Sequence, residues 1–169
     1  YVLDFTQEKP TATYNLGENA VYAVKYFNSN DVCIVGSKSA FTLNIGGGSL
    51  KTVDYSNMQL TAFDINTDTD TFVLSLSRSG DGRTCSIEFV NSSGEPVNVN
   101  DTNLAIESIS LYKNRVAALD SDRCYLFDTD GNKIGKADAG NGSKSVRLGN
   151  ADEAYILGIN EIRRIVQFK

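Results

Sequence analysis

Short apolar runs recur along the chain at a nearly constant interval. Each run is rich in β-branched residues and is bounded by Asn, Asp, Ser or Gly, which is the usual pattern of a buried β-strand. Successive runs begin about 40 residues apart, a spacing typical of repeated structural units. They occupy residues 31–36, 71–76, 115–120 and 153–158. The pattern therefore predicts four copies of one β-unit, each with a buried strand near its centre.

The segments around each run alternate between apolar and polar residues and complete the unit. One strand is expected before each run, at residues 20–26, 60–65, 105–111 and 143–148. Another follows each run, at residues 40–43, 86–90, 124–127 and 162–168. A last strand follows a hairpin turn of Asn or Asp and Gly, at residues 50–55, 96–100 and 133–137. Such turns suit hairpins because the Asx side chain bonds the backbone ahead of it and Gly accepts a positive φ.

Four strands at this period are the signature of β-propeller blades. One such sheet cannot bury both of its faces alone, whereas sheets stacked around an axis can. The predicted fold class is therefore all-β, a β-propeller or a half-propeller fragment of four-stranded antiparallel meander blades. We expect a partial blade at residues 1–17, blades at 18–58, 59–103 and 104–141, and a partial blade at 142–169.

One copy of the repeat carries a family resemblance. The run at 115–120, the sequence Tyr125-Leu126-Phe127-Asp128, the turn at Gly131 and the pair Lys133-Ile134 follow one another. This order resembles the repeats of bacterial YVTN-type and quinoprotein-like propellers, and those of envelope-anchored propeller proteins of Gram-positive bacteria. The resemblance implies a cell-envelope or extracellular location and a membrane-anchored parent. The resemblance is limited to architecture, because the chain has no Trp and so lacks the Trp motifs of quinoprotein and WD40 blades.

Composition narrows the possible chemistry. The net charge is −5 and no Lys/Arg-rich block is present, which disfavours nucleic acid as a partner. The chain has no His, so it has no His-based nucleophile pair and no His-ligated zinc. Its apolar runs are too short for a membrane-spanning helix, so we expect no direct membrane insertion. Three Cys residues are expected to be buried thiols, with one disulfide plus one thiol as the alternative: Cys33, Cys85 and Cys124.

One turn resembles the start of a calcium loop. Asp128, Asp130 and Asn132 place oxygen ligands at alternate positions, which is the spacing that calcium loops use. The alternative is a polar hairpin turn, which is favoured because Asp-Gly pairs are common in hairpins and a distal Glu ligand is missing. We therefore expect no cofactor, with calcium as the one candidate metal.

Three other groups of residues have an ordinary structural interpretation beside a functional one. The acidic segment at 67–70 and the glycines at 46–48 are expected to be turns. Arg163 and Arg164 should point to opposite faces of a strand, so they do not form one anion pocket. Five tyrosines are expected to pack between blades, with a carbohydrate groove as the alternative: Tyr22, Tyr26, Tyr55, Tyr112 and Tyr155.

These observations favour a non-catalytic binding or scaffold module that binds a protein or carbohydrate through propeller surfaces. The alternative is a carboxylate-based glycosidase or lyase that uses the axial face, which would need two carboxyl groups about 5–10 Å apart. Three blades between two partial ones are fewer than the four to eight of a closed ring. We therefore expect either a homo-oligomer or the remainder of a longer propeller chain.

Overall fold

The computed structural model describes residues 1–3, 6–78 and 83–169, and these residues form antiparallel sheets. The first sheet comprises β1 (Val21–Tyr26), β2 (Asp31–Gly36), β3 (Ser39–Asn44) and β4 (Ser49–Asp54). The second comprises β5 (Gln59–Asn66), β6 (Thr71–Ser77), β7 (Cys85–Asn91) and β8 (Pro96–Asp101). The third comprises β9 (Ser108–Tyr112), β10 (Arg115–Asp120), β11 (Arg123–Asp128) and β12 (Lys133–Asp138). The fourth has three strands, β13 (Ser145–Asn150), β14 (Glu153–Leu157) and β15 (Ile162–Ile165).

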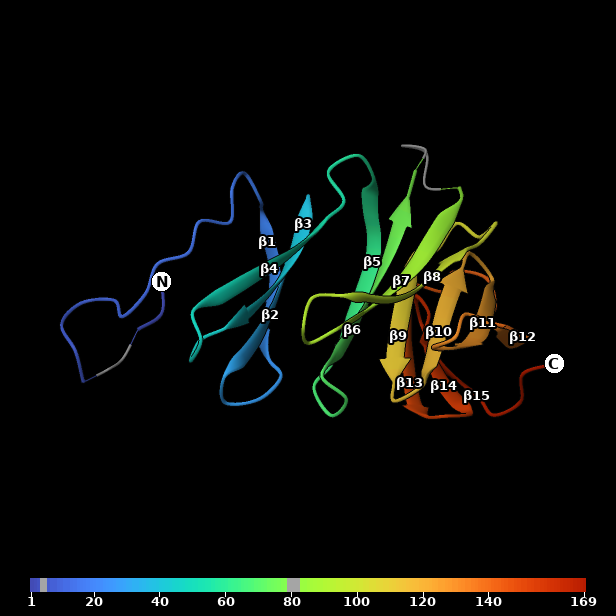
Figure 1. Cartoon of the computed structure of the whole chain (residues 1–169). Helices are drawn as coiled ribbons and strands as arrows, with labels where there is room; N and C mark the ends of the chain where they lie inside the picture. Colours follow the sequence, from blue (N-terminus) through green and yellow to red (C-terminus); the bar gives the residue numbers. More distant parts are fainter. Residues whose placement is uncertain (4–5, 79–82) are drawn as a thin grey trace.

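The sheets stand side by side in chain order, and the two termini lie at opposite ends of the row (Figure 1). Within each sheet the strands pair in sequence order, as in a meander. The all-β fold of propeller blades expected from the sequence is confirmed. Within the described residues, no helix has the length and apolar character needed to cross a membrane.

Alternate side chains of each central strand pack into two different interfaces. In β6, Phe72 and Leu74 belong to the core shared with the first sheet, and Val73 belongs to the core shared with the third. In β10, Val116 faces the second sheet and Ala117 faces the fourth. Burial on both faces explains why these strands are continuous apolar runs in the sequence.

The central strand of the fourth sheet differs from this pattern. The sequence predicts that residues 154–157 are buried throughout, and this is wrong for two of the four. Ala154 and Ile156 are buried against the third sheet, but Tyr155 and Leu157 are 40% and 49% exposed. The reason is that no described sheet covers the far face of β14.

Several strand boundaries differ from those predicted from the sequence. The strand expected at 162–168 ends at Ile165, and the chain then turns to β12, where Lys169 and Lys136 exchange two backbone hydrogen bonds of 2.9 Å. Tyr55, expected at the end of a strand, follows β4, and its buried hydroxyl donates to the Gly36 carbonyl at 2.6 Å. That hydrogen bond and the near-complete burial of Tyr55 give it a packing role.

The three cysteines are buried, as expected, and none is in a disulfide. Burial raises the pKa of the Cys33 and Cys124 thiols to about 12. Thiols with such a pKa hold almost no reactive thiolate at neutral pH.

We expect the native protein to resist alkylation by iodoacetamide at pH 8. Once the chain is unfolded without reductant, all three thiols should react, and mass spectrometry of the intact protein measures this directly. Fewer than three adducts on the unfolded chain would reveal a disulfide and contradict the expectation.

Candidate binding site at the inner strands

The first strand of each sheet lies at the inner side of the row, where β5 runs beside β9 and β9 beside β13. These strands line an open pocket of about 330 Å³. Its walls combine aromatic, charged and hydroxyl side chains from all four inner strands or the residues beside them: Tyr22, Leu60, Thr61, Ala62, Phe63, Glu107, Ser108, Ile109 and Arg147. The pocket therefore depends on the stacking of all four sheets.

Asp64 on β5 connects three of the inner strands. One of its carboxylate oxygens accepts the backbone N–H of Leu111 on β9 at 2.8 Å. The other accepts the Arg147 guanidinium on β13, also at 2.8 Å. The Asp64 side chain is only 16% exposed, whereas the Arg147 side chain is 68% exposed. Asp64 thus fixes the position of Arg147 at the pocket wall.

Two serines of β9 perform a similar connection to β13. The Ser108 hydroxyl accepts the N–H of Val146 at 3.1 Å, and the Ser110 hydroxyl accepts the N–H of Leu148 at 3.0 Å. These side chain to backbone bonds take the place of a backbone ladder between strands of different sheets. The wall between β9 and β13 is therefore held by polar contacts.

The arrangement is suited to binding. Arg147 supplies a cation, Glu107 an anion, Tyr22 and Phe63 aromatic rings, and Thr61 and Ser108 hydroxyl groups. A pocket of this size with a mainly polar lining and aromatic rings beside it can hold a ligand through fixed charged and hydrogen-bonding groups.

The three calcium candidates, for which the sequence favours a polar turn, lie at the hairpin between β11 and β12: Asp128, Asp130 and Asn132. The Asp128 carboxylate accepts the backbone N–H of Asn132 at 2.8 Å and its side-chain amide at 3.1 Å. These hydrogen bonds hold the pKa of Asp128 below its usual value. Asp130 is exposed on the same turn, and Gly131 adopts a φ of 85°. No group of three Asp, Glu, Cys or His side chains that could hold a metal ion occurs among the described residues.

The other candidates from the sequence are dispersed over the structure. Residues 67–70 and 46–48 form turns between strands, as expected. Arg163 bonds Glu161 and Arg164 bonds Glu153, so the two arginines have separate partners. Of the five tyrosines, Tyr22 lines the inner pocket, Tyr26 lines a groove at the N-terminal end and Tyr55 is in the core. They do not form one carbohydrate groove.

Sequence reasoning missed Arg147, which lines this pocket, and Asp64, the partner that holds it. Asp64 and Arg147 are 83 residues apart, and each is a single charge within an otherwise ordinary alternating strand. The one available signal is an acidic residue flanked by Phe63 and Ile65 in a half-buried strand, where an unpaired carboxylate is costly.

We expect Asp64→Ala to lower the free energy of unfolding by about 1–3 kcal/mol, because the N–H of buried Leu111 loses its acceptor. Arg147→Ala should cost less than about 1 kcal/mol, because its side chain is largely exposed. Urea unfolding of both variants measures the difference. Equal losses would show that the ion pair, rather than the buried acceptor, provides the stability.

We expect calcium to leave the melting temperature unchanged, because both carboxylate oxygens of Asp128 already accept hydrogen bonds from Asn132. Differential scanning fluorimetry with calcium or a chelator tests this, with Asp128→Ala as the control. A rise of several degrees in calcium that Asp128→Ala abolishes would establish a calcium site.

Comparison with solved structures supports the propeller architecture. A protein of unknown function from Bacteroides caccae shares 16% identity with the chain and superposes with a TM-score of 0.57, over 90% of this chain and 63% of that one. The β-propeller domain of Cps50 (Swd1) from Myceliophteria thermophila shares 9% identity and superposes with a TM-score of 0.67, over 89% of this chain and 52% of that one. BamB from Moraxella catarrhalis shares 11% identity and superposes with a TM-score of 0.59, over 86% of this chain and 42% of that one. The chain thus spans about two fifths to two thirds of these structures.

A search of curated proteins finds no match. Residues 6–166 match the family described as a family of unknown function, DUF5711. Since the match covers nearly the whole chain, the protein belongs to the DUF5711 family.

Proposed function

We propose that this chain is a non-catalytic binding or scaffold module whose inner pocket binds a segment of a partner protein. The observation that supports this most directly is the pocket itself, which presents Glu107, Arg147 and Tyr22 together. Such a mixture suits a short polypeptide, because a peptide offers donors, acceptors and apolar side chains at close spacing.

The proposed setting is the cell envelope or the cell exterior, in a membrane-anchored parent. This part of the proposal is based on the resemblance of the repeat sequence to envelope-anchored propellers. A carbohydrate ligand is the other class that aromatic and hydroxyl groups can bind, and the experiment below includes it.

Selection from a random peptide library on the immobilised chain, followed by fluorescence anisotropy with the selected peptides, tests the proposal. We expect Tyr22→Ala and Glu107→Ala each to weaken peptide binding at least tenfold, because both side chains line the pocket. Tyr26→Ala is the matched control, since Tyr26 lies on the same strand with nearly the same exposure but outside the pocket. Binding that is confined to a glycan array, or that is equally sensitive to Tyr26→Ala, would contradict the proposal.

One observation favours a carboxylate-based glycosidase or lyase as the second candidate. The pKa of Asp120 is raised, first by burial and further by the negative charges of Glu107 and Asp122. A carboxyl group with a raised pKa beside a second carboxylate is the arrangement that general acid catalysis uses.

Release of reducing sugar from a panel of polysaccharides distinguishes the two candidates. The binding module should release none. Turnover that is lost in both Asp120→Asn and Glu107→Gln would replace the proposed function with the enzyme.

A further inference from the structure

The four inner strands share one distinctive position in the repeat. In each sheet it is the residue just before the one that pairs with the fifth residue of the central strand. β1 and β5 bulge at this point, because their ladders to β2 and β6 each skip one residue. In the third and fourth sheets this residue precedes the strand and donates its backbone N–H to the central strand, at 2.9 and 2.8 Å. We call the residues at this position the inner row: Tyr22, Thr61, Glu107 and Lys144.

The inner row stands apart from the apolar packing between the sheets. Within the described residues, none of its members belongs to a hydrophobic core. A bulge turns its extra side chain out of the regular alternation of a strand, and bulges occur often beside binding sites. Tyr22, Thr61 and Glu107 accordingly line the inner pocket, and Lys144 is exposed just before β13. The row therefore gives each sheet one side chain that the packing of the sheets does not use.

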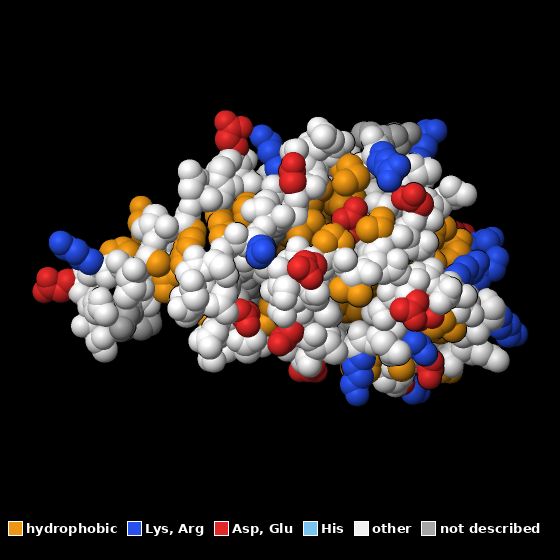
Figure 2. Space-filling model, viewed as in Figure 1, with side chains coloured by type: hydrophobic (Ala, Val, Ile, Leu, Met, Phe, Trp, Pro, Cys, Tyr) orange, Lys and Arg blue, Asp and Glu red, His pale blue; other side chains and the backbone are white. Residues whose placement is uncertain are grey.

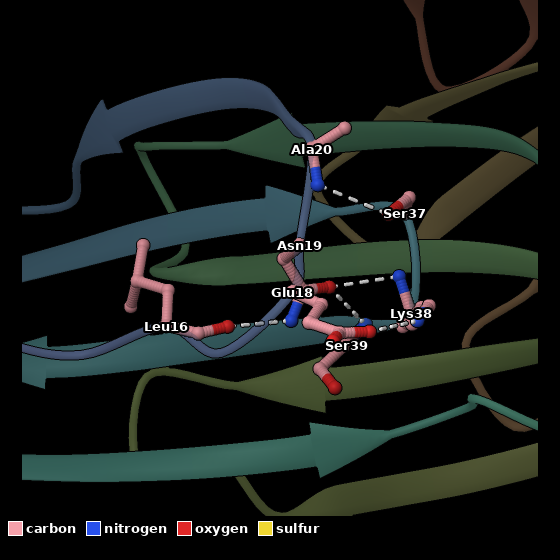
Figure 3. A network of polar contacts seen from close by, with 7 residues as sticks. All are labelled: Leu16, Glu18, Asn19, Ala20, Ser37, Lys38 and Ser39. Carbon is pink, nitrogen blue, oxygen red and sulfur yellow. Dashed lines mark hydrogen bonds and ion pairs between the residues drawn. The ribbon is translucent and has the colours of Figure 1, made fainter.

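Tyr22 is held at the pocket by the residues that lead into β1 (Figure 3). The Ala20 N–H donates to the Ser37 hydroxyl at 3.1 Å. The Asn19 side-chain carbonyl accepts two backbone N–H groups of the segment that joins β2 and β3, at 2.8 and 2.9 Å. These bonds tie the start of β1 to that segment, so the bulge that carries Tyr22 begins from a fixed point.

Two members of the inner row carry charges that no other described residue neutralises. Glu107 and Lys144 belong to neighbouring sheets, and neither forms an ion pair within the part of the chain that the structure describes. Asp64 and Arg147 differ from them, because they pair with each other at 2.8 Å. A ligand can therefore place opposite charges at Glu107 and Lys144 without displacing an internal ion pair.

Recognition by charge has to come from individual residues of this surface. Side chains of both signs occur along the whole length of the face seen in Figure 2. A broad field of one sign would attract any ligand of the opposite sign. Single charges at fixed positions instead set the register of a partner and reject partners that carry a like charge there.

The spacing of the inner row fits an extended polypeptide. β5, β9 and β13 lie side by side, and Cα atoms of neighbouring strands approach within 8 Å. Alternate side chains of an extended chain point the same way and are roughly 6.6 Å apart. A segment that crosses these strands can therefore place every second side chain opposite the next member of the row. Glu107 and Lys144 then contact two side chains that are separated by one residue.

We propose that the inner row recognises an extended partner segment with a basic side chain opposite Glu107 and, beyond one intervening residue, an acidic side chain opposite Lys144. Tyr22 presents its ring to an apolar side chain at the other end of the row. Thr61 adds little selectivity, because its hydroxyl already bonds that of Ser75 at 2.8 Å. This inference rests on the proposed function, since it specifies the sequence that a peptide in the inner pocket carries.

Charge exchange between the chain and the peptide tests the contact at Glu107. The probes are peptides selected from the random library on the wild-type chain, which we expect to contain a basic and an acidic residue separated by one residue. Replacing the basic residue of such a peptide by Glu should weaken binding about tenfold or more, because two like charges then meet. Glu107→Lys should restore most of the lost affinity. Fluorescence anisotropy measures each combination of chain and peptide.

A second exchange tests the contact at Lys144. Replacing the acidic residue of the peptide by Lys should also weaken binding about tenfold or more, and Lys144→Glu should restore it. The crossed combinations should restore nothing, because each chain variant then meets a peptide that is altered at the other contact. Selective rescue of this kind separates two ordered contacts from a general effect of charge.

Lys25→Glu is the matched control. Lys25 is an exposed Lys on the inner strand β1, but it lies outside the inner row. It pairs with the third residue of its central strand, as Asp64 does on β5. Lys25→Glu should restore neither exchanged peptide. The side chains of Lys25, Glu107 and Lys144 are all exposed, so the variants should melt at the wild-type temperature, which differential scanning fluorimetry checks.

The outcomes separate this inference from the proposed function. Peptides that depend on Tyr22 but tolerate both charge exchanges would overturn the inference and leave the proposed function standing. Rescue by Lys25→Glu, or equal rescue by the crossed combinations, would also overturn it. If no peptide binds the chain, the proposed function fails and this inference fails with it.

Discussion

The structure depends on central strands whose alternate side chains belong to two interfaces. Phe72 and Val73 are neighbours in β6, yet they pack against different sheets. A sheet of this kind cannot remove its apolar surface from water unless another sheet lies on each side. Stability therefore comes from the stack, and the ends of the stack are where side chains of the same type meet solvent.

This constraint explains how much of the fold the sequence predicts. Burial on both faces produces uninterrupted apolar runs, and Asx-Gly turns mark the hairpins, so the sheets and their order are predictable. The exposure of Tyr155 and Leu157 is not predictable in this way. The composition of a run shows what a strand can pack against, but it does not show whether the neighbouring sheet is present.

The inner pocket could not be predicted for a different reason. Asp64 and Arg147 come from the second and fourth sheets, and Leu111, which Asp64 also bonds, comes from the third. Tyr22 and Tyr55 have the same side chain and both follow a strand pattern, but one lines the pocket and the other is in the core. Tyr22 lies on β1, the first strand of its sheet, whereas Tyr55 follows β4, the last, so the place of each strand in the stack decides which side chains reach the inner side.

Apolar packing between sheets and hydrogen bonds between inner strands have different roles, and this difference affects binding. Apolar packing between sheets holds the stack and includes the pocket residue Ile109, while the inner strands are also connected by Asp64, Ser108 and Ser110 through hydrogen bonds to backbone N–H groups. The wall is thus polar and already ordered before a ligand arrives, which lowers the entropy cost of binding. Because the stack does not depend on Tyr22 or Glu107, which are exposed at the pocket, these positions can vary without disturbing the fold. A frame held by its apolar interfaces can therefore present different binding surfaces on its inner strands.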